Sequence, residues 1–285
     1  MFLNKIIFFL FIILSPSFVY SNAKMGGDFS EDYFKKFEIY KSFKCNELNR
    51  DSVLNNKLFK KNFSGNIQWR LALSQKVCDR NISFLKDENN QDYVNLSAGV
   101  GDGIGNKYNK KENSTWNDFK YLERRRFEVS TDQFDFSKKS FVLEYDIRIP
   151  KKHKFIKEND SLGVGQLHSK ENDAIWRFFL MDSGYWVASV KAIDPEDYQK
   201  WNNIKIIINN YKNNYGLIII VNDEIIHNAK TNNEYLMWAE YKKDTLFWKI
   251  GLYQQKLYEN FYNTDEQSVD LKNVKAFAYD KHIEF

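Results

Sequence analysis

The sequence is poor in the residues that break, cross-link or anchor a chain. Its 285 residues contain only three prolines and two cysteines, and after the N-terminus no apolar run is long enough to cross a membrane. The scarcity of proline argues against a long disordered linker. No internal repeat and no sign of a second domain interrupts the chain, so we expect one large domain after the N-terminal segments.

Charge of one sign is also lacking. Lys and Arg number 42 against 38 Asp and Glu, which gives a formal net charge of +4 at pH 7. Such a small excess does not by itself mark a protein that binds a polyanion. Local clusters of charge are therefore more informative than the total.

The first 23 residues have the pattern of a secretory signal peptide. Lys5 supplies a positive charge, Ile6–Leu14 form a short apolar run, and residues 19–23 offer a cleavage region. The run is short for a membrane span, although an uncleaved anchor is the alternative. We expect a secreted or periplasmic protein with no membrane attachment once residues 1–23 are removed.

The two cysteines, Cys45 and Cys78, predict a disulfide, because an exported protein with an even cysteine count usually forms one. Closing this loop would contribute about 3–4 kcal/mol in the chain-entropy description. The alternative is two unpaired, buried thiols. Neither cysteine has the spacing of a metal site or of a nucleophile motif.

Residues 24–64 form a predicted helical region ahead of the main domain. Phe34, Phe37, Tyr40 and Phe43 recur every three residues in a charged stretch, as on one face of an amphipathic helix. We expect this apolar stripe to pack on the main domain rather than to bind a ligand.

Residues 65–285 have the pattern of β-strands. Short segments alternate polar with apolar residues or are continuously apolar, and Asn, Gly and Lys connect them. Many strands at this spacing predict an all-β sandwich or jelly roll. Asn222-Asp223 predicts a hairpin turn. The predicted strands are 67–73, 92–98, 123–130, 140–149, 161–168, 174–181, 185–190, 203–209, 217–221, 246–254 and 274–279.

Three of these segments carry polar residues that fit together as one active site. Side chains alternate between the two faces of a strand, so the polar residues of each segment share a face and its apolar residues point to the core. The first segment contributes Arg124, Arg126 and Glu128, the second Gln166 and His168, and the third Lys249, Tyr253 and Gln255. An Arg held by a Glu can bind a sugar carboxylate with two hydrogen bonds, while His and Tyr can move protons.

This set resembles the jelly-roll polysaccharide lyases. Alginate lyases carry R-x-E, Q-[IV]-H and Y-x-K-x-G-x-Y-x-Q segments in this order. Here Phe247 replaces the first Tyr of the third segment, and Ser130 stands where a second Arg is usual. The stretch from Phe141 to His168 is more similar to the heparin lyase I and glucuronan lyase group. The three segments read Arg126-Phe127-Glu128, Gln166-Leu167-His168 and Phe247-Trp248-Lys249-Ile250-Gly251-Leu252-Tyr253-Gln254-Gln255.

The resemblance covers roughly residue 67 to the C-terminus. It implies an all-β jelly roll, a sandwich of the concanavalin A type, and β-elimination in an acidic polysaccharide that contains uronate. Tyr253 is the expected acid, and His168 or Tyr253 the base. The resemblance implies no cofactor. A structural calcium ion, as in relatives of heparin lyase I, is an open alternative. We expect a monomer with no nucleic-acid partner. The implied catalytic residues are Gln166, His168 and Tyr253, and the implied substrate-binding residues are Arg124, Arg126, Glu128, Lys249 and Gln255.

Two other functions stay open. A glycan-binding sandwich would use the same arginines and aromatic residues without chemistry. A glycoside hydrolase would need two carboxylates facing one groove, and Glu144 with Asp146 is the nearest pair. The glycine-rich residues 99–105 are followed by polar sequence rather than by a helix, so we interpret them as a loop beside the groove and not as a dinucleotide site.

Overall fold

The computed structural model describes residues 48–71, 81–98, 125–135, 139–150, 162–169, 174–211, 214–231, 245–254 and 267–284. These ranges all belong to one compact unit, Lys41–Phe285. The signal sequence, the aromatic stripe of residues 34–43, both cysteines, the glycine-rich loop, Arg124 and Gln255 lie outside the described residues. The predictions made for them, and the domain boundaries at 23 and 64, stay predictions.

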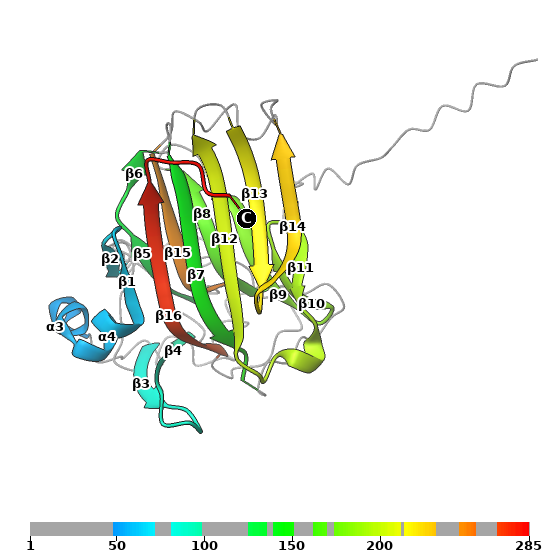
Figure 1. The fold of residues 1–285 in the computed structure, drawn as a ribbon. Helices are drawn as coiled ribbons and strands as arrows, with labels where there is room; N and C mark the ends of the chain where they lie inside the picture. Colours follow the sequence, from blue (N-terminus) through cyan, green and yellow to red (C-terminus); the bar gives the residue numbers. More distant parts are fainter. Residues whose placement is uncertain are drawn as a thin grey trace, which may run out of the picture. The chain divides into compact units, whose positions relative to one another are not determined.

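The described residues form an all-β sandwich of two antiparallel sheets, which confirms the predicted jelly-roll class (Figure 1). We name each sheet after one of its inner strands. The β7 sheet has the order β14 (Glu224–Thr231), β13 (Asn214–Val221), β12 (Asn202–Tyr211), β7 (Ser140–Arg148), β16 (Gln267–Tyr279), β4 (Asp92–Ala98) and β3 (Ile82–Lys86), and β1 (Phe63–Gly65) pairs in parallel with β16.

The β15 sheet forms the second layer. Its order is β11 (Val190–Ile193), β10 (Gly184–Val187), β9 (Ala174–Met181), β8 (Leu162–Ser169), β15 (Thr245–Gln254), β5 (Arg125–Thr131) and β2 (Trp69–Leu71), and β6 (Phe134–Asp135) also pairs with β15. Helical structure among the described residues comprises α3 (Arg50–Asn55), α4 (Lys57–Asn62) and the 3-10 helix η2 (Pro195–Asp197). Within the described ranges, no helix has the length and apolar character that crossing a membrane requires.

The core lies between the sheets and follows the alternation in the sequence. Leu143 and Ile147 of β7, together with Trp248 and Ile250 of β15, belong to one fully buried apolar cluster. Two buried tyrosines join the layers, because the hydroxyl groups of Tyr145 (β7) and Tyr185 (β10) lie 2.8 Å apart in a hydrogen bond. Burial raises the pKa of both phenols. The pair therefore stays neutral and satisfies two polar groups that would otherwise be unpaired in the core.

The strand boundaries agree with the sequence where the alternation is strong and differ where the backbone turns. β4 and β9 have the predicted bounds. The predicted strand 185–190 is two strands, because Ala188 and Ser189 adopt φ values of 47° and 70° and form a tight turn. β16 begins at Gln267 rather than at 274, since a bulge at Asn273 lets the strand continue. Strand β3, an edge strand, was not predicted.

The hairpin predicted at Asn222-Asp223 is present, and both residues adopt the positive φ that its turn requires. Its apolar first strand is buried on both faces. Leu217 and Ile219 pack in the core, whereas Ile218 belongs to a second apolar cluster on the outer face of the β7 sheet. The sequence predicted only the core side for this run.

The C-terminal residues cover this second cluster. After β16 the chain crosses the sheet toward β12 and β13 (Figure 1), and Ile283 packs against the second cluster, which includes Ile207 and Ile218. The Ile283 amide donates to Asn209 Oδ1 at 3.0 Å, and Asn209 Nδ2 donates to the Ile283 carbonyl at 2.9 Å. One asparagine of β12 therefore holds the tail in place.

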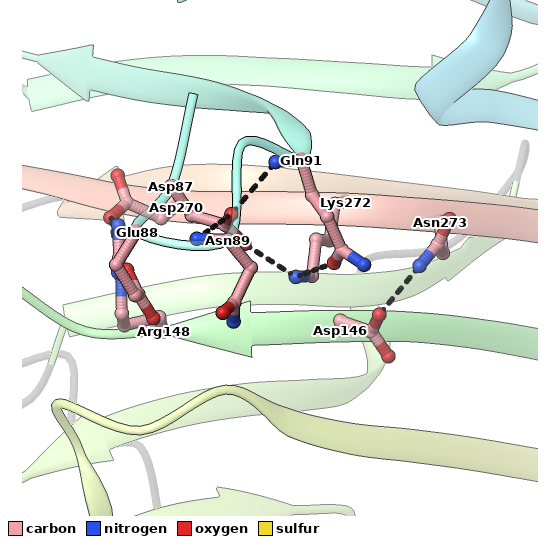
Figure 2. Close-up of polar contacts among 9 residues, drawn as sticks. All are labelled: Asp87, Glu88, Asn89, Gln91, Asp146, Arg148, Asp270, Lys272 and Asn273. Atoms are coloured by element: carbon pink, nitrogen blue, oxygen red, sulfur yellow. Dashed lines mark hydrogen bonds and ion pairs between the residues drawn. The ribbon is translucent and has the colours of Figure 1, made fainter. Parts of the chain in front are cut away.

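A charged network occupies another part of the outer face of the β7 sheet, as Figure 2 shows. Lys272 of β16 donates to Asp87 and Gln91 at 2.8 Å each. Arg148 of β7 forms ion pairs with Asp270 and Glu88, each at 3.0 Å. The network ties the β3–β4 hairpin to the centre of the sheet.

Trp201 lies among the cations of this network. The Arg148 guanidinium and the Lys272 ammonium lie 4.6 Å and 4.2 Å from its ring, and Tyr93 meets it edge-on at 5.6 Å. Cations at this distance from an indole are attracted by its π-electrons. Because both cations also have carboxylate partners, we interpret the network as structural.

We expect Lys272→Met to destabilise the protein at neutral pH and to have less effect in acid. The hydrogen bond from Lys272 lowers the pKa of Asp87 below its ordinary value of 3.8. A carboxylate with a lowered pKa stabilises the fold above that ordinary value, and the contribution is lost as pH falls through the folded value. Urea unfolding of both proteins at neutral pH and at about pH 3 measures this difference.

The matched control for this substitution is Lys200→Met. Lys200 pairs with Asp197 on the exposed surface, and such pairs change stability by about 0–1 kcal/mol. A Lys272→Met variant whose stability loss is the same at both pH values would contradict the assignment.

Candidate functional site

The three segments predicted to form the site are adjacent strands of one sheet. β15 lies between β5 and β8, and all three are antiparallel. The core side is as predicted, because Phe127, Val129, Trp248, Ile250 and Leu252 are all fully buried in the core. Residues of the opposite parity therefore share the other face, which we call the polar face.

One register position of the polar face carries a row of hydrogen-bonding side chains. Lys249 of β15 lies opposite Ser130 of β5 on one side and opposite Gln166 of β8 on the other. Gln166 in turn lies opposite Arg177 of β9. Directly opposed residues of antiparallel strands have Cβ atoms about 4.5–5.5 Å apart. We name Ser130, Lys249, Gln166 and Arg177 the charged row.

Arg177 is the member of this row that sequence reasoning missed. It lies between Trp176 and Phe178, which are both buried in the core, so its side chain belongs to the polar face. That alternation was visible in the sequence. Its position beside Gln166 was not, because it depends on which strand pairs with β8.

Glu128 and Gln166 are joined across the sheet. Gln166 Nε2 donates to Glu128 Oε1 at 2.8 Å, and both side chains are almost fully buried. The bond fixes the orientation of the amide and leaves its second N–H and its carbonyl oxygen for other partners. The two predicted residues are thus brought together, with Glu128 orienting Gln166.

Gly251 makes room for this contact. It lies opposite Glu128 with φ of 136°, a conformation that residues with a side chain rarely adopt. A Cβ atom at this position would lie 2.2 Å from the Phe127 carbonyl oxygen and 2.9 Å from Glu128 Cα. Only glycine fits, which gives the glycine of the third segment a structural reason.

Phe247 links His168 and Lys249. It lies opposite His168 in the β8–β15 register, and the two rings stack at 5.0 Å with planes 27° apart. Lys249 Nζ lies 5.1 Å from the centre of the same ring. Phe247 therefore contacts both the imidazole of His168 and the ammonium of Lys249.

Tyr253 lies at the other end of the polar face from His168. It is half-buried and opposed by Gly163 of β8 and by Arg126 of β5. Gly163 and His168 are five residues apart, roughly 16 Å along a regular strand. Bulges near Ile250 and Gly163 interrupt the regular pairing between them. Gln166 is therefore nearer to Tyr253 along β8 than His168 is.

The carboxylate pair considered for a hydrolase lies on the other sheet. Glu144 and Asp146 belong to β7 and point to its outer face. Lys275 Nζ donates to Glu144 at 3.1 Å, and Asn203 and Asn273 donate to Asp146 at 2.7 Å each. The pair is therefore separated from the polar face by the core. Among the described residues, no three His, Cys, Asp or Glu side chains are grouped as a metal site would require.

Comparison with known proteins gives a likeness of fold. No protein-family model matches the sequence, and no curated protein matches it. An alginate lyase of polysaccharide lyase family 7 is 14% identical, with a TM-score of 0.46 over 74% of this chain and 93% of that one. The exolytic family-7 alginate lyase from Zobellia galactanivorans is 13% identical, with a TM-score of 0.46 over 76% of this chain and 96% of that one.

A β-glucanase catalytic domain of glycoside hydrolase family 131 from Podospora anserina is 9% identical, with a TM-score of 0.45 over 76% of this chain and 86% of that one. Sandwich folds carry many unrelated functions, so a function has to come from the residues of the polar face. The resemblance to the heparin lyase I and glucuronan lyase group stays a prediction.

Proposed function

We propose that the protein is an exported polysaccharide lyase that cleaves a uronate-containing acidic polysaccharide by β-elimination. The observation that carries the proposal is the charged row, which shares the polar face of one sheet with Tyr253. The charged row supplies an oriented amide and two cations for the carboxylates of an acidic polymer, and Tyr253 supplies a phenol for proton transfer on the same face.

The charged row would act on the carboxylate at C5 of the sugar. A negative carboxylate makes the neighbouring C5–H a poor acid. Gln166, held by Glu128, would donate its second N–H to a carboxylate oxygen, while Lys249 beside it neutralises the negative charge of that carboxylate. Groups fixed in advance at developing charge usually make the largest contribution to catalysis.

Proton transfer completes the elimination. A base takes the C5 proton, the C5–H electrons form the C4–C5 double bond, and the C4–O4 bond breaks as an acid protonates the leaving oxygen. Tyr253 is the proposed acid. Gln166, which would bind the carboxylate, lies nearer to Tyr253 than His168 does. Tyr253 can therefore also serve as the base at C5, while His168 contacts a neighbouring position of the substrate chain.

Glycan binding without chemistry is the second candidate. The position of His168, five residues beyond the Gly163 that faces Tyr253, favours it, since a lyase that used both groups would need them at one sugar unit. A binding protein would use the charged row and the aromatic residues but would leave the polymer intact.

Incubation with a panel of polymers tests the proposal. Alginate, glucuronan and a heparin-like polymer should include one that gives unsaturated uronate, seen by its ultraviolet absorbance, while a neutral glucan should not react. Binding should weaken with added salt, because charged contacts are screened. Arg177→Gln should weaken binding about five- to thirty-fold, and Lys205→Gln on the other sheet is the matched control. New reducing ends without unsaturation would indicate a hydrolase, and binding without cleavage would indicate a lectin.

A further inference from the structure

A second row crosses the polar face beside the charged row and is aromatic. Tyr253 of β15 lies opposite Gly163 of β8, Gly163 lies opposite Phe179 of β9, and Phe179 lies opposite Trp186 of β10. Opposed residues of antiparallel strands share a face. We name Tyr253, Gly163, Phe179 and Trp186 the aromatic row.

Burial of the neighbouring residues confirms which way the two rings point. Phe178 and Leu180 flank Phe179 and are fully buried in the core. Tyr185 and Val187 flank Trp186 and are also fully buried. Phe179 and Trp186 are themselves only partly buried, so both rings belong to the polar face and remain partly open to solvent.

Gly163 lets β8 approach β15 closely beside Tyr253. A Cβ atom on it would lie 2.8 Å from the Tyr253 carbonyl oxygen and 3.4 Å from Tyr253 Cβ. Gly163 therefore places no side chain between Tyr253 and Phe179 in the row, and a larger residue there would push the two strands apart. At the far end, Trp186 Nε1 donates to Ser183 Oγ at 3.4 Å, which restrains the indole.

We propose that Phe179 and Trp186 form a subsite that stacks the next sugar unit of the substrate beside the unit at Tyr253. This rests on the proposed function, and it adds that the polymer crosses the strands from β15 toward β10. The C–H bonds on one face of a pyranose ring make that face apolar, so it can lie on an aromatic ring and displace water.

Arg177 makes this subsite selective for an acidic unit. It lies two residues from Phe179 on the same face of β9, about 6.6 Å along the strand. A sugar ring on Phe179 therefore brings its carboxylate within reach of the Arg177 guanidinium, which binds carboxylates with two hydrogen bonds. The subsite thus favours a polymer with uronates in succession over one in which neutral sugars alternate with uronates.

The test compares oligosaccharides of increasing length on Phe179→Leu and Trp186→Leu, which keep apolar volume and remove the ring. Each variant, combined with Tyr253→Phe to prevent cleavage, should bind long uronate oligosaccharides about five- to thirty-fold more weakly and the shortest ones equally well. In the variants with Tyr253 intact, KM for long substrates should rise while kcat changes little. Tyr279→Leu, a partly buried aromatic of the other sheet, is the control, and thermal unfolding checks the fold of each variant.

The outcomes separate the subsite from the proposed function. If polymer is cleaved but affinity for every length is unchanged in both ring variants, the subsite is wrong and the lyase stands. If the variants lose affinity equally for the shortest and longest chains, the rings hold the reacting unit instead and the subsite is again wrong. A wild-type protein that neither binds nor cleaves acidic polymers overturns the proposed function and the subsite together.

Discussion

Replacing Tyr253 by Phe should lower turnover about 10²- to 10⁴-fold, the usual contribution of a positioned proton-transfer group, while polymer binding stays within about two-fold. The substitution removes only the hydroxyl group and keeps the half-buried ring between Gly163 and Arg126. The hydroxyl acts on the transition state more than on the bound substrate. Initial rates of unsaturated uronate formation and a direct binding measurement give the two quantities.

His168→Ala is the informative comparison for this experiment. If His168 is the base, His168→Ala should lower turnover as much as Tyr253→Phe does, although the Tyr253 hydroxyl is still present. If Tyr253 serves as acid and base, His168→Ala should mainly raise KM, because His168 then contacts another part of the polymer. Full turnover by the Tyr253→Phe variant would contradict the proposed mechanism.

Gly251→Ala should destabilise the protein by about 2–4 kcal/mol. The added Cβ would lie 2.2 Å from the Phe127 carbonyl oxygen, in a backbone conformation with φ of 136°. Relief requires β5 to move away from β15, which also shifts Glu128 and so releases the Gln166 amide. Chemical denaturation measures the stability loss, and activity at a temperature where the variant is still folded measures the effect on the site.

Gly184→Ala is the matched control for this loss. Gly184 has nearly the same φ of 139°, but its Cβ would lie 2.8 Å from the nearest backbone atom and far from Glu128 in the register. It should cost less stability and leave kcat unchanged. Equal stability loss in both variants would show that backbone strain, and not the collision with β5, dominates at Gly251.

The sequence predicted the sandwich because burial has a period of two in most strands. In β15 the large apolar residues Trp248, Ile250 and Leu252 alternate with Phe247, Lys249 and Tyr253, and the structure follows that alternation. The prediction was wrong where a local turn decides, as at Ala188-Ser189. No pattern of apolar residues signals a turn made by two residues of positive φ that are neither Gly nor Asn.

The faces of the candidate site were predictable, but its register was not. Parity alone put Gln166, His168, Lys249 and Tyr253 on one face. It did not show the register of β8 against β15, in which Lys249 faces Gln166 and Tyr253, beyond a bulge, faces Gly163. Arg177 and the aromatic row were missed for the same reason, since their role depends on cross-strand neighbours that a single sequence does not encode.

The tail that covers the β7 sheet also decides how the protein can be handled. Ile283 is held to Asn209 by two hydrogen bonds and shields the apolar residues Ile207 and Ile218. A fusion partner or surface linker joined after residue 285 could disturb the contacts of this short segment. Truncation after Tyr279 would expose the apolar residues that Ile283 covers. Immobilisation at a point away from this tail would avoid both problems.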